Sequence, residues 1–108
     1  YLQLKTAFDQ LDTANESIAF HPDEIYLITL IAMLFHEFDF EDSMTFITYY
    51  GRDNDTVVAI AGAILGAYWG ADKLPADMTQ KILEVNRNEI GLALVEIANQ
   101  MTAWRYPQ

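Results

Sequence analysis

Apolar residues recur at helical spacing along most of the chain. Between residues 4 and 14 they fall three or four positions apart, which predicts one amphipathic helix. The segment His21-Pro22-Asp23-Glu24 is typical of a helix start, because proline suits the first turn and acids favour the positive end of the helix dipole. The stretch from Ile25 to Phe38 that follows carries large apolar residues on several faces. We therefore expect a central, largely buried helix there.

A short helix and its stop signal come next. A break over residues 39–43 leads into a predicted helix that starts at Glu41 or Asp42 and ends at Tyr50. Gly51 closes this helix in the manner of a C-cap, because glycine readily takes the left-handed conformation that such a position requires.

The longest apolar stretch of the chain begins soon after that glycine. A polar turn over residues 51–56 leads into a helix over residues 56–69 that is apolar on all sides, and such helices are normally buried. We therefore place it near the centre of the fold. The stretch is too short for a bilayer span, which needs about 20 residues, so no membrane partner is expected. One face carries small residues and would let another helix approach closely: Ala59, Gly62, Ala63, Gly66, Ala67 and Gly70.

Two further helices are predicted after a turn at Leu74-Pro75. One covers residues 76–84 and the other covers residues 89–101. The positions expected to point inward on the first are Met78, Ile82 and Val85. Because no stretch alternates in the manner of a strand, we predict an all-α fold, a compact helical bundle that occupies residues 1–108 as a single domain or as a fragment of a larger one.

Composition narrows the classes of function. The chain has 16 Asp and Glu against 6 Lys and Arg, and its net charge of −10 repels phosphate backbones, so we expect no nucleic-acid partner. The absence of cysteine excludes disulfides, thiolate zinc sites and a cysteine nucleophile. No signal peptide is visible, and we expect a cytoplasmic protein.

Residues 53–56 are the chemically most informative part of the chain. Asp53 and Asp55 lie two positions apart in a turn, and Thr56 follows directly. Mg²⁺ usually takes one or two carboxylates and keeps several waters, so this turn could serve as part of a magnesium site. The same residue types also commonly cap helices. The spacing leaves both interpretations open.

The stretch from Gly51 to Gly70 closely resembles the C-terminal signature of the ADP-ribosylglycohydrolase family. That pattern reads Gly-Gly-Asp-x-Asp-Thr, then an apolar helix with Ala-Gly-Ala and Gly-Ala-Tyr-x-Gly, then Leu/Ile-Pro, and Leu74-Pro75 stands in the expected place. The likeness covers about residues 23–85 and continues more weakly to residue 101. It implies an all-α fold, hydrolysis of N- or O-glycosidic bonds of ADP-ribose, and a pair of Mg²⁺ ions.

The resemblance assigns roles to few individual residues. Asp53, Asp55 and Thr56 match the acids and the hydroxyl that bind metal in the family. Arg52 stands where many members have glycine, and either a phosphate contact or a harmless replacement would account for it.

The family's second acidic motif lies in the N-terminal half of its longer members and has no convincing counterpart in this chain. Asp12-Thr13 is a poor substitute for it, and Glu41-Asp42 is better explained as the acidic start of a helix. The chain therefore resembles a C-terminal piece of such an enzyme.

Two hypotheses follow. In the first, the chain is the C-terminal part of a Mg²⁺-dependent ADP-ribosylglycohydrolase whose parent protein takes an ADP-ribose-containing substrate. The isolated chain would then bind Mg²⁺ weakly and be inactive, and it would form a homo-oligomer or associate with the missing N-terminal part, through residues 1–40. In the second, the chain is a non-catalytic acidic helical module whose Asp-rich turn only caps a helix.

Overall fold

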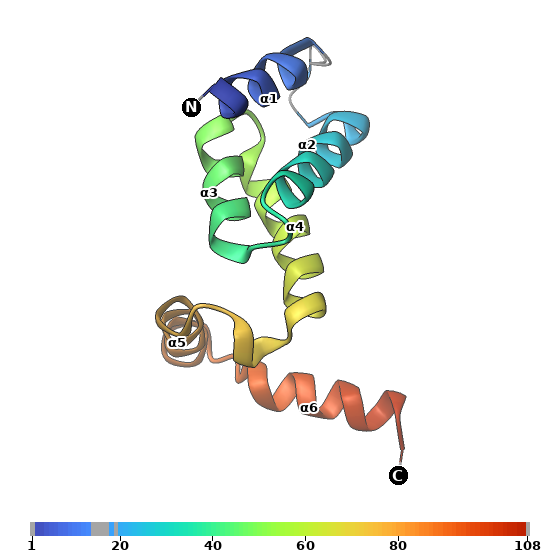
Figure 1. Cartoon of the computed structure of the whole chain (residues 1–108). Coiled ribbons are helices and arrows are strands. Elements are labelled where there is room, and N and C mark those ends of the chain that lie inside the picture. Colours follow the sequence, from blue (N-terminus) through green and yellow to red (C-terminus); the bar gives the residue numbers. More distant parts are fainter. Residues whose placement is uncertain (1, 14–17, 19, 108) are drawn as a thin grey trace. The chain divides into compact units, whose positions relative to one another are not determined.

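The computed structural model of the protein describes residues 2–13, 18 and 20–107. These residues form six α-helices and two short helical segments, and they contain no strand, so the predicted all-α class is confirmed (Figure 1). The chain divides into two compact units, Tyr1–Gly70 and Ala71–Gln108. Each unit is described by itself.

The first unit contains four packed helices. Their bounds are Leu2–Thr13 for α1, Pro22–Phe35 for α2, Phe40–Tyr50 for α3 and Asn54–Trp69 for α4. Helices α2, α3 and α4 contact one another pairwise, and α1 lies against α2. The Phe8 ring of α1 also packs against α3, with its centroid 5.0 Å from that of Phe46. The core of the unit consists of Ala7, Leu11, Ile28, Ala32, Phe46, Ile47, Val57 and Ala61. The loop expected after α1 falls mainly on residues 14–17, which lie outside the described residues.

Helix α2 begins where the sequence predicts and ends before the apolar stretch does. His21 is its N-cap, and the Nδ1 atom of His21 accepts a hydrogen bond from the Asp23 N–H at 3.4 Å. The helix stops at Phe35 because Glu37 and Phe38 take left-handed φ angles of +53° and +66°. The expected burial of this helix is wrong in part. Ile28, Ala32 and Met33 are buried, whereas Tyr26, Leu34 and Phe35 are exposed.

Helix α3 begins one residue before the predicted start. The Asp39 carboxylate caps it by accepting a hydrogen bond from the Asp42 N–H at 2.9 Å, so the helix already begins at Phe40. At the other end, Gly51 has a φ of +88°, which confirms the predicted glycine stop.

Helix α4 is not buried on all sides, contrary to the expectation. Ile60 and Ile64 are 40% and 43% exposed, because only one side of the helix faces the core of its unit. The close approach expected on its small-residue face is also wrong at Gly62, where an added Cβ would meet nothing within 4 Å. The buried residues of α4 lie at intervals of four and are Val57, Ala61 and Leu65.

The second unit is helical but has no core of its own. A 3-10 helix, Ala71–Lys73, precedes α5 (Ala76–Val85), and a π-helical segment, Asn86–Ile90, leads toward α6 (Leu94–Arg105). The last helix therefore begins later than the predicted residue 89. Gly91 takes a left-handed φ of +77°, which ends the preceding helical segment.

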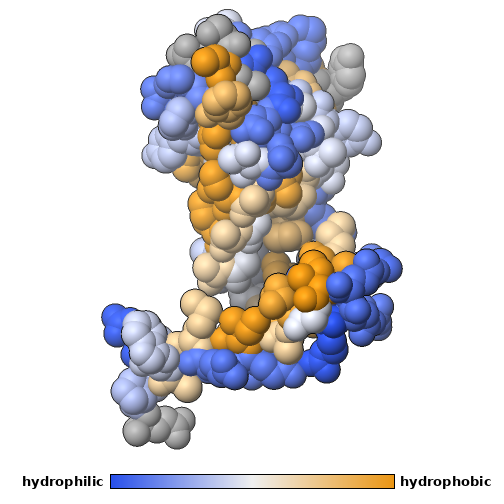
Figure 2. All heavy atoms as spheres, turned by 180° about the vertical axis from the view of Figure 1, so that it is seen from behind, coloured by the Kyte–Doolittle hydropathy of each residue, from blue (hydrophilic) through white to orange (hydrophobic). Residues whose placement is uncertain are grey.

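The apolar residues of this second unit reach the surface. None of its described residues is buried, and hydrophobic side chains are visible on the face drawn in Figure 2. The predicted inward positions of α5 are therefore wrong within the unit, since Met78 and Ile82 are both exposed and Val85 is half-buried. No helix among residues 2–13, 18 and 20–107 is both long and apolar enough to cross a membrane.

Candidate metal site

The candidate acids follow a sharp turn between α3 and α4. Gly51 and Arg52 both have left-handed φ angles, +88° and +57°, and Asp53 then has φ −84° and ψ +55°. Two consecutive residues with left-handed φ angles let α4 begin at Asn54, with only three residues between the two helices. Glycine takes this conformation freely, whereas arginine takes it at a cost in free energy.

Asp53 occupies the N-cap position of α4 without using its side chain as a cap. Its carbonyl oxygen accepts a hydrogen bond from the Val57 N–H at 3.3 Å, but its carboxylate makes no capping bond. The Oδ2 atom is buried and has no hydrogen-bond partner among the described residues. The Asp53 side chain is therefore not the cap of α4, and its buried Oδ2 atom carries the free-energy cost of a polar atom without a partner.

The other two candidate ligands lie in the first turn of α4. Asp55 is exposed, Thr56 is half-buried, and the buried Val57 fixes this turn to the core. Within the described part of the chain, no three His, Asp or Glu side chains come together as a metal-binding group. The turn therefore offers one or two carboxylates and a hydroxyl. Such a set, with the buried Oδ2 atom of Asp53, fits a Mg²⁺ ion that keeps most of its waters and does not fit a site made entirely of protein ligands.

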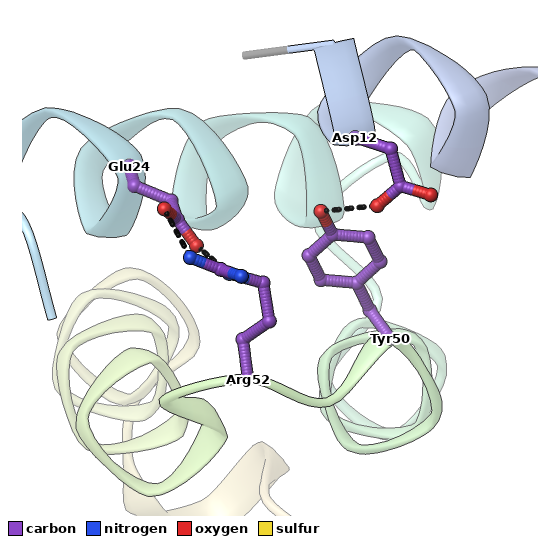
Figure 3. A network of polar contacts seen from close by, with 4 residues as sticks. All are labelled: Asp12, Glu24, Tyr50 and Arg52. Carbon is purple, nitrogen blue, oxygen red and sulfur yellow. Dashed lines mark hydrogen bonds and ion pairs between the residues drawn. The ribbon is translucent and has the colours of Figure 1, made fainter. Parts of the chain in front are cut away.

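Arg52 forms a fork-shaped ion pair with Glu24 of α2 (Figure 3). The Arg52 Nη2 donates to Glu24 Oε2 at 2.9 Å, and the Arg52 Nε donates to Glu24 Oε1. The Glu24 side chain is only 2% exposed. Its hydrogen bond raises the pKa of the Arg52 guanidinium above the ordinary value, and the charges of Glu24, Tyr50 and Asp12 act in the same direction. Arginine side chains stay protonated in proteins, so Arg52 carries a positive charge.

A second polar contact holds the other side of Gly51. The hydroxyl of Tyr50, the last residue of α3, donates to the Asp12 Oδ1 of α1 at 3.0 Å (Figure 3). The residues on either side of Gly51 are thus tied to two different helices. No local pattern predicts the partners in these contacts, because Glu24 and Asp12 are 28 and 38 residues away from the groups they bind.

Comparison with models of protein families shows which family the chain belongs to. The model of the ADP-ribosylglycohydrolase family matches residues 4–107, which is almost the whole sequence. The chain belongs to the ADP-ribosylglycohydrolase family. The match includes α2 to α6 and most of α1, so it confirms the resemblance and extends it across both units. No curated protein and no solved structure gives a significant match.

In this member of the ADP-ribosylglycohydrolase family, Arg52 has a left-handed φ that glycine adopts freely. The pattern has glycine at both positions before the first aspartate, and both positions here are left-handed. Arg52 therefore keeps a backbone conformation that suits glycine. Its guanidinium binds Glu24, which provides a structural reason for the arginine that neither sequence-based explanation had included.

Proposed function

We propose that this chain supplies part of a Mg²⁺ site to an ADP-ribosylglycohydrolase that hydrolyses a glycosidic bond of an ADP-ribose-containing substrate. The observation that supports the proposal best is the Oδ2 atom of Asp53, which is buried within the turn of residues 51–56 and bonded neither to the N-terminus of α4 nor to another described group. A carboxylate oxygen held in this way is suited to a cation.

Each candidate residue has a distinct part in the proposal. Asp53 would hold the cation from a partly buried position, Asp55 would add a carboxylate from the solvent side, and Thr56 would add a neutral hydroxyl. A cation bound there supplies Lewis-acid polarisation of oxygen atoms and a template for the attacking water. The protein residues themselves fix the position of the carboxylates, since Val57 anchors the first turn of α4 in the core.

The complete family site has two Mg²⁺ ions and needs more acids than this turn provides. We infer that the remaining ligands come from another segment, either the N-terminal part of a longer protein or another chain. We also infer that such a segment, or a second copy, binds through residues 1–40. An open groove of about 660 Å³ between α1 and α2 supports this inference, because apolar residues that include Leu2, Ile31, Leu34 and Phe35 line it. A monomer by light scattering at high protein concentration would contradict the association.

The metal proposal is tested by titrating the whole chain with Mn²⁺, a paramagnetic substitute for Mg²⁺, and following NMR line broadening at residues 53–56. Asp53→Asn removes a ligand charge and is expected to weaken binding at least tenfold, an order of magnitude taken from the effects of changes close to metal sites. Asp72→Asn is the matched control, since Asp72 is an exposed acid of the 3-10 helix. Equal Mn²⁺ affinity in the wild type and in Asp53→Asn would favour the non-catalytic acidic module.

A further inference from the structure

We propose that Arg52 and Glu24 are positioning residues that fix the carboxylate of Asp53 for cation binding. The inference rests on the proposed function of the turn and adds two residues outside the candidate ligand set. Neither residue is a ligand in this proposal. They act by holding the backbone conformation from which Asp53 projects.

The backbone of Arg52 needs support from its surroundings. Arg52 has a φ of +57°, and a residue with a side chain keeps such a conformation only when its surroundings hold it there. Gly51 next to it offers no resistance to rotation, because glycine tolerates many backbone conformations. Without a contact from elsewhere, the segment that leads to Asp53 would therefore have several accessible states.

The ion pair between Arg52 and Glu24 has a geometry that can provide this support. Two hydrogen bonds between one guanidinium and one carboxylate fix orientation as well as distance. Glu24 is itself firmly placed, since it lies one helical turn before the buried Ile28 on α2. Burial of the Glu24 carboxylate also makes a cationic partner necessary, because an unpaired charge in that position is strongly unfavourable.

The turn between α3 and α4 is held from both sides of Gly51. Tyr50 is bound to Asp12 of α1 before Gly51, and Arg52 is bound to Glu24 of α2 after it (Figure 3). These contacts limit the motion that Gly51 would otherwise allow. Asp53 comes directly after Arg52, so the Arg52–Glu24 pair is the nearer of these two contacts along the chain.

An effect of Arg52 through its charge and an effect through positioning predict opposite changes in cation affinity when Arg52 is removed. A positive side chain near the site repels a divalent cation, so its loss would raise cation affinity if Arg52 acted through charge alone. Loss of a positioning contact lowers metal affinity instead, typically by about 10–100-fold. The sign of the change therefore separates the two roles.

The experiment measures Mn²⁺ affinity of the whole chain by NMR line broadening at residues 53–56. Arg52→Gly suits the left-handed backbone but removes the ion pair, and Arg52→Lys keeps the charge but loses the fork. We expect both variants to weaken Mn²⁺ binding by about tenfold. Lys5→Gln, which removes an exposed cation from α1, is the matched control and is expected to change the affinity less than about twofold. Circular dichroism verifies that each variant keeps its helix content.

The outcomes separate this inference from the proposed function. If Asp53→Asn weakens binding while Arg52→Gly leaves it unchanged or tightens it, the positioning role is wrong and the metal site stands. If the wild type shows no saturable broadening, or if Asp53→Asn binds as the wild type does, the metal site fails and the positioning role fails with it. If Arg52→Gly does not fold, Arg52→Lys decides, and wild-type affinity in that variant overturns the positioning role.

Discussion

Both units of the chain consist of helices that carry apolar residues, but only the first unit buries them. In the first unit, α2, α3 and α4 bury a shared set of residues, and polar contacts from α1 and α2 hold the turn before α4. In the second unit, α5 and α6 are formed, yet none of the described residues is buried. A segment can thus form helices without forming a hydrophobic core, and only the first unit has both. The candidate metal ligands and the Arg52–Glu24 ion pair lie in the first unit, where packed helices can hold them in place.

The largest expected effect comes from separating the units. A peptide of residues 1–70 is expected to melt cooperatively, because it retains the whole hydrophobic core. A peptide of residues 71–108 is expected to have little helix in water, because isolated helices of about 12 residues are marginal without packing. Circular dichroism during heating measures both. A cooperative melting transition of residues 71–108 alone would show that the second unit has a hydrophobic core of its own.

The next effect compares the same substitution in the two units. Ile47→Ala is expected to lower the free energy of unfolding by about 2–5 kcal/mol, because Ile47 is completely buried in α3. Ile82→Ala on α5 is the matched control and is expected to change it by less than about 0.5 kcal/mol, since Ile82 is 55% exposed. Urea unfolding of the whole chain provides both values. A large loss in the Ile82 variant would mean that this side chain is covered in solution.

The smallest effect uses two glycines with different backbone conformations. Gly62 lies within α4 and has open space around the position of a Cβ, so Gly62→Ala is expected to stabilise the first unit by about 0.5–1 kcal/mol. Gly91 has a left-handed φ of +77°, so Gly91→Ala is expected to destabilise the chain by about 1–2 kcal/mol. Urea unfolding again measures the change. A loss of stability in Gly62→Ala would indicate that another surface packs on this face of α4.

Local signals predicted the ends of helices well. Pro22, Gly51 and Pro75 each act on the backbone within a few residues of themselves, and the structure places a helix boundary at each of them. Non-local packing was less predictable. An apolar stretch such as the one in α4 is compatible with burial on every side, but the partner helices of its unit cover only the side of Val57, Ala61 and Leu65.

The candidate site shows the same limit. The Asp-x-Asp-Thr segment could be found in the sequence, because its residues are adjacent and match a family signature. The role of Glu24 could not be found, because an acid in the first turn of a helix already has a sufficient local explanation in the helix dipole. Its contact with Arg52 depends on the packing of α2 beside the α3–α4 turn, and no pattern within either segment specifies that packing.

The ion pair between Arg52 and Glu24 also constrains the order in which such a sequence can evolve. Arginine at a left-handed position is disfavoured until an acid is available to hold it, and a buried acid is disfavoured until a cation is available to neutralise it. Each substitution is therefore harmful alone and acceptable in the presence of the other, which is reciprocal epistasis. Once both charged residues are present, reversion at either position alone is opposed, and the pair becomes entrenched.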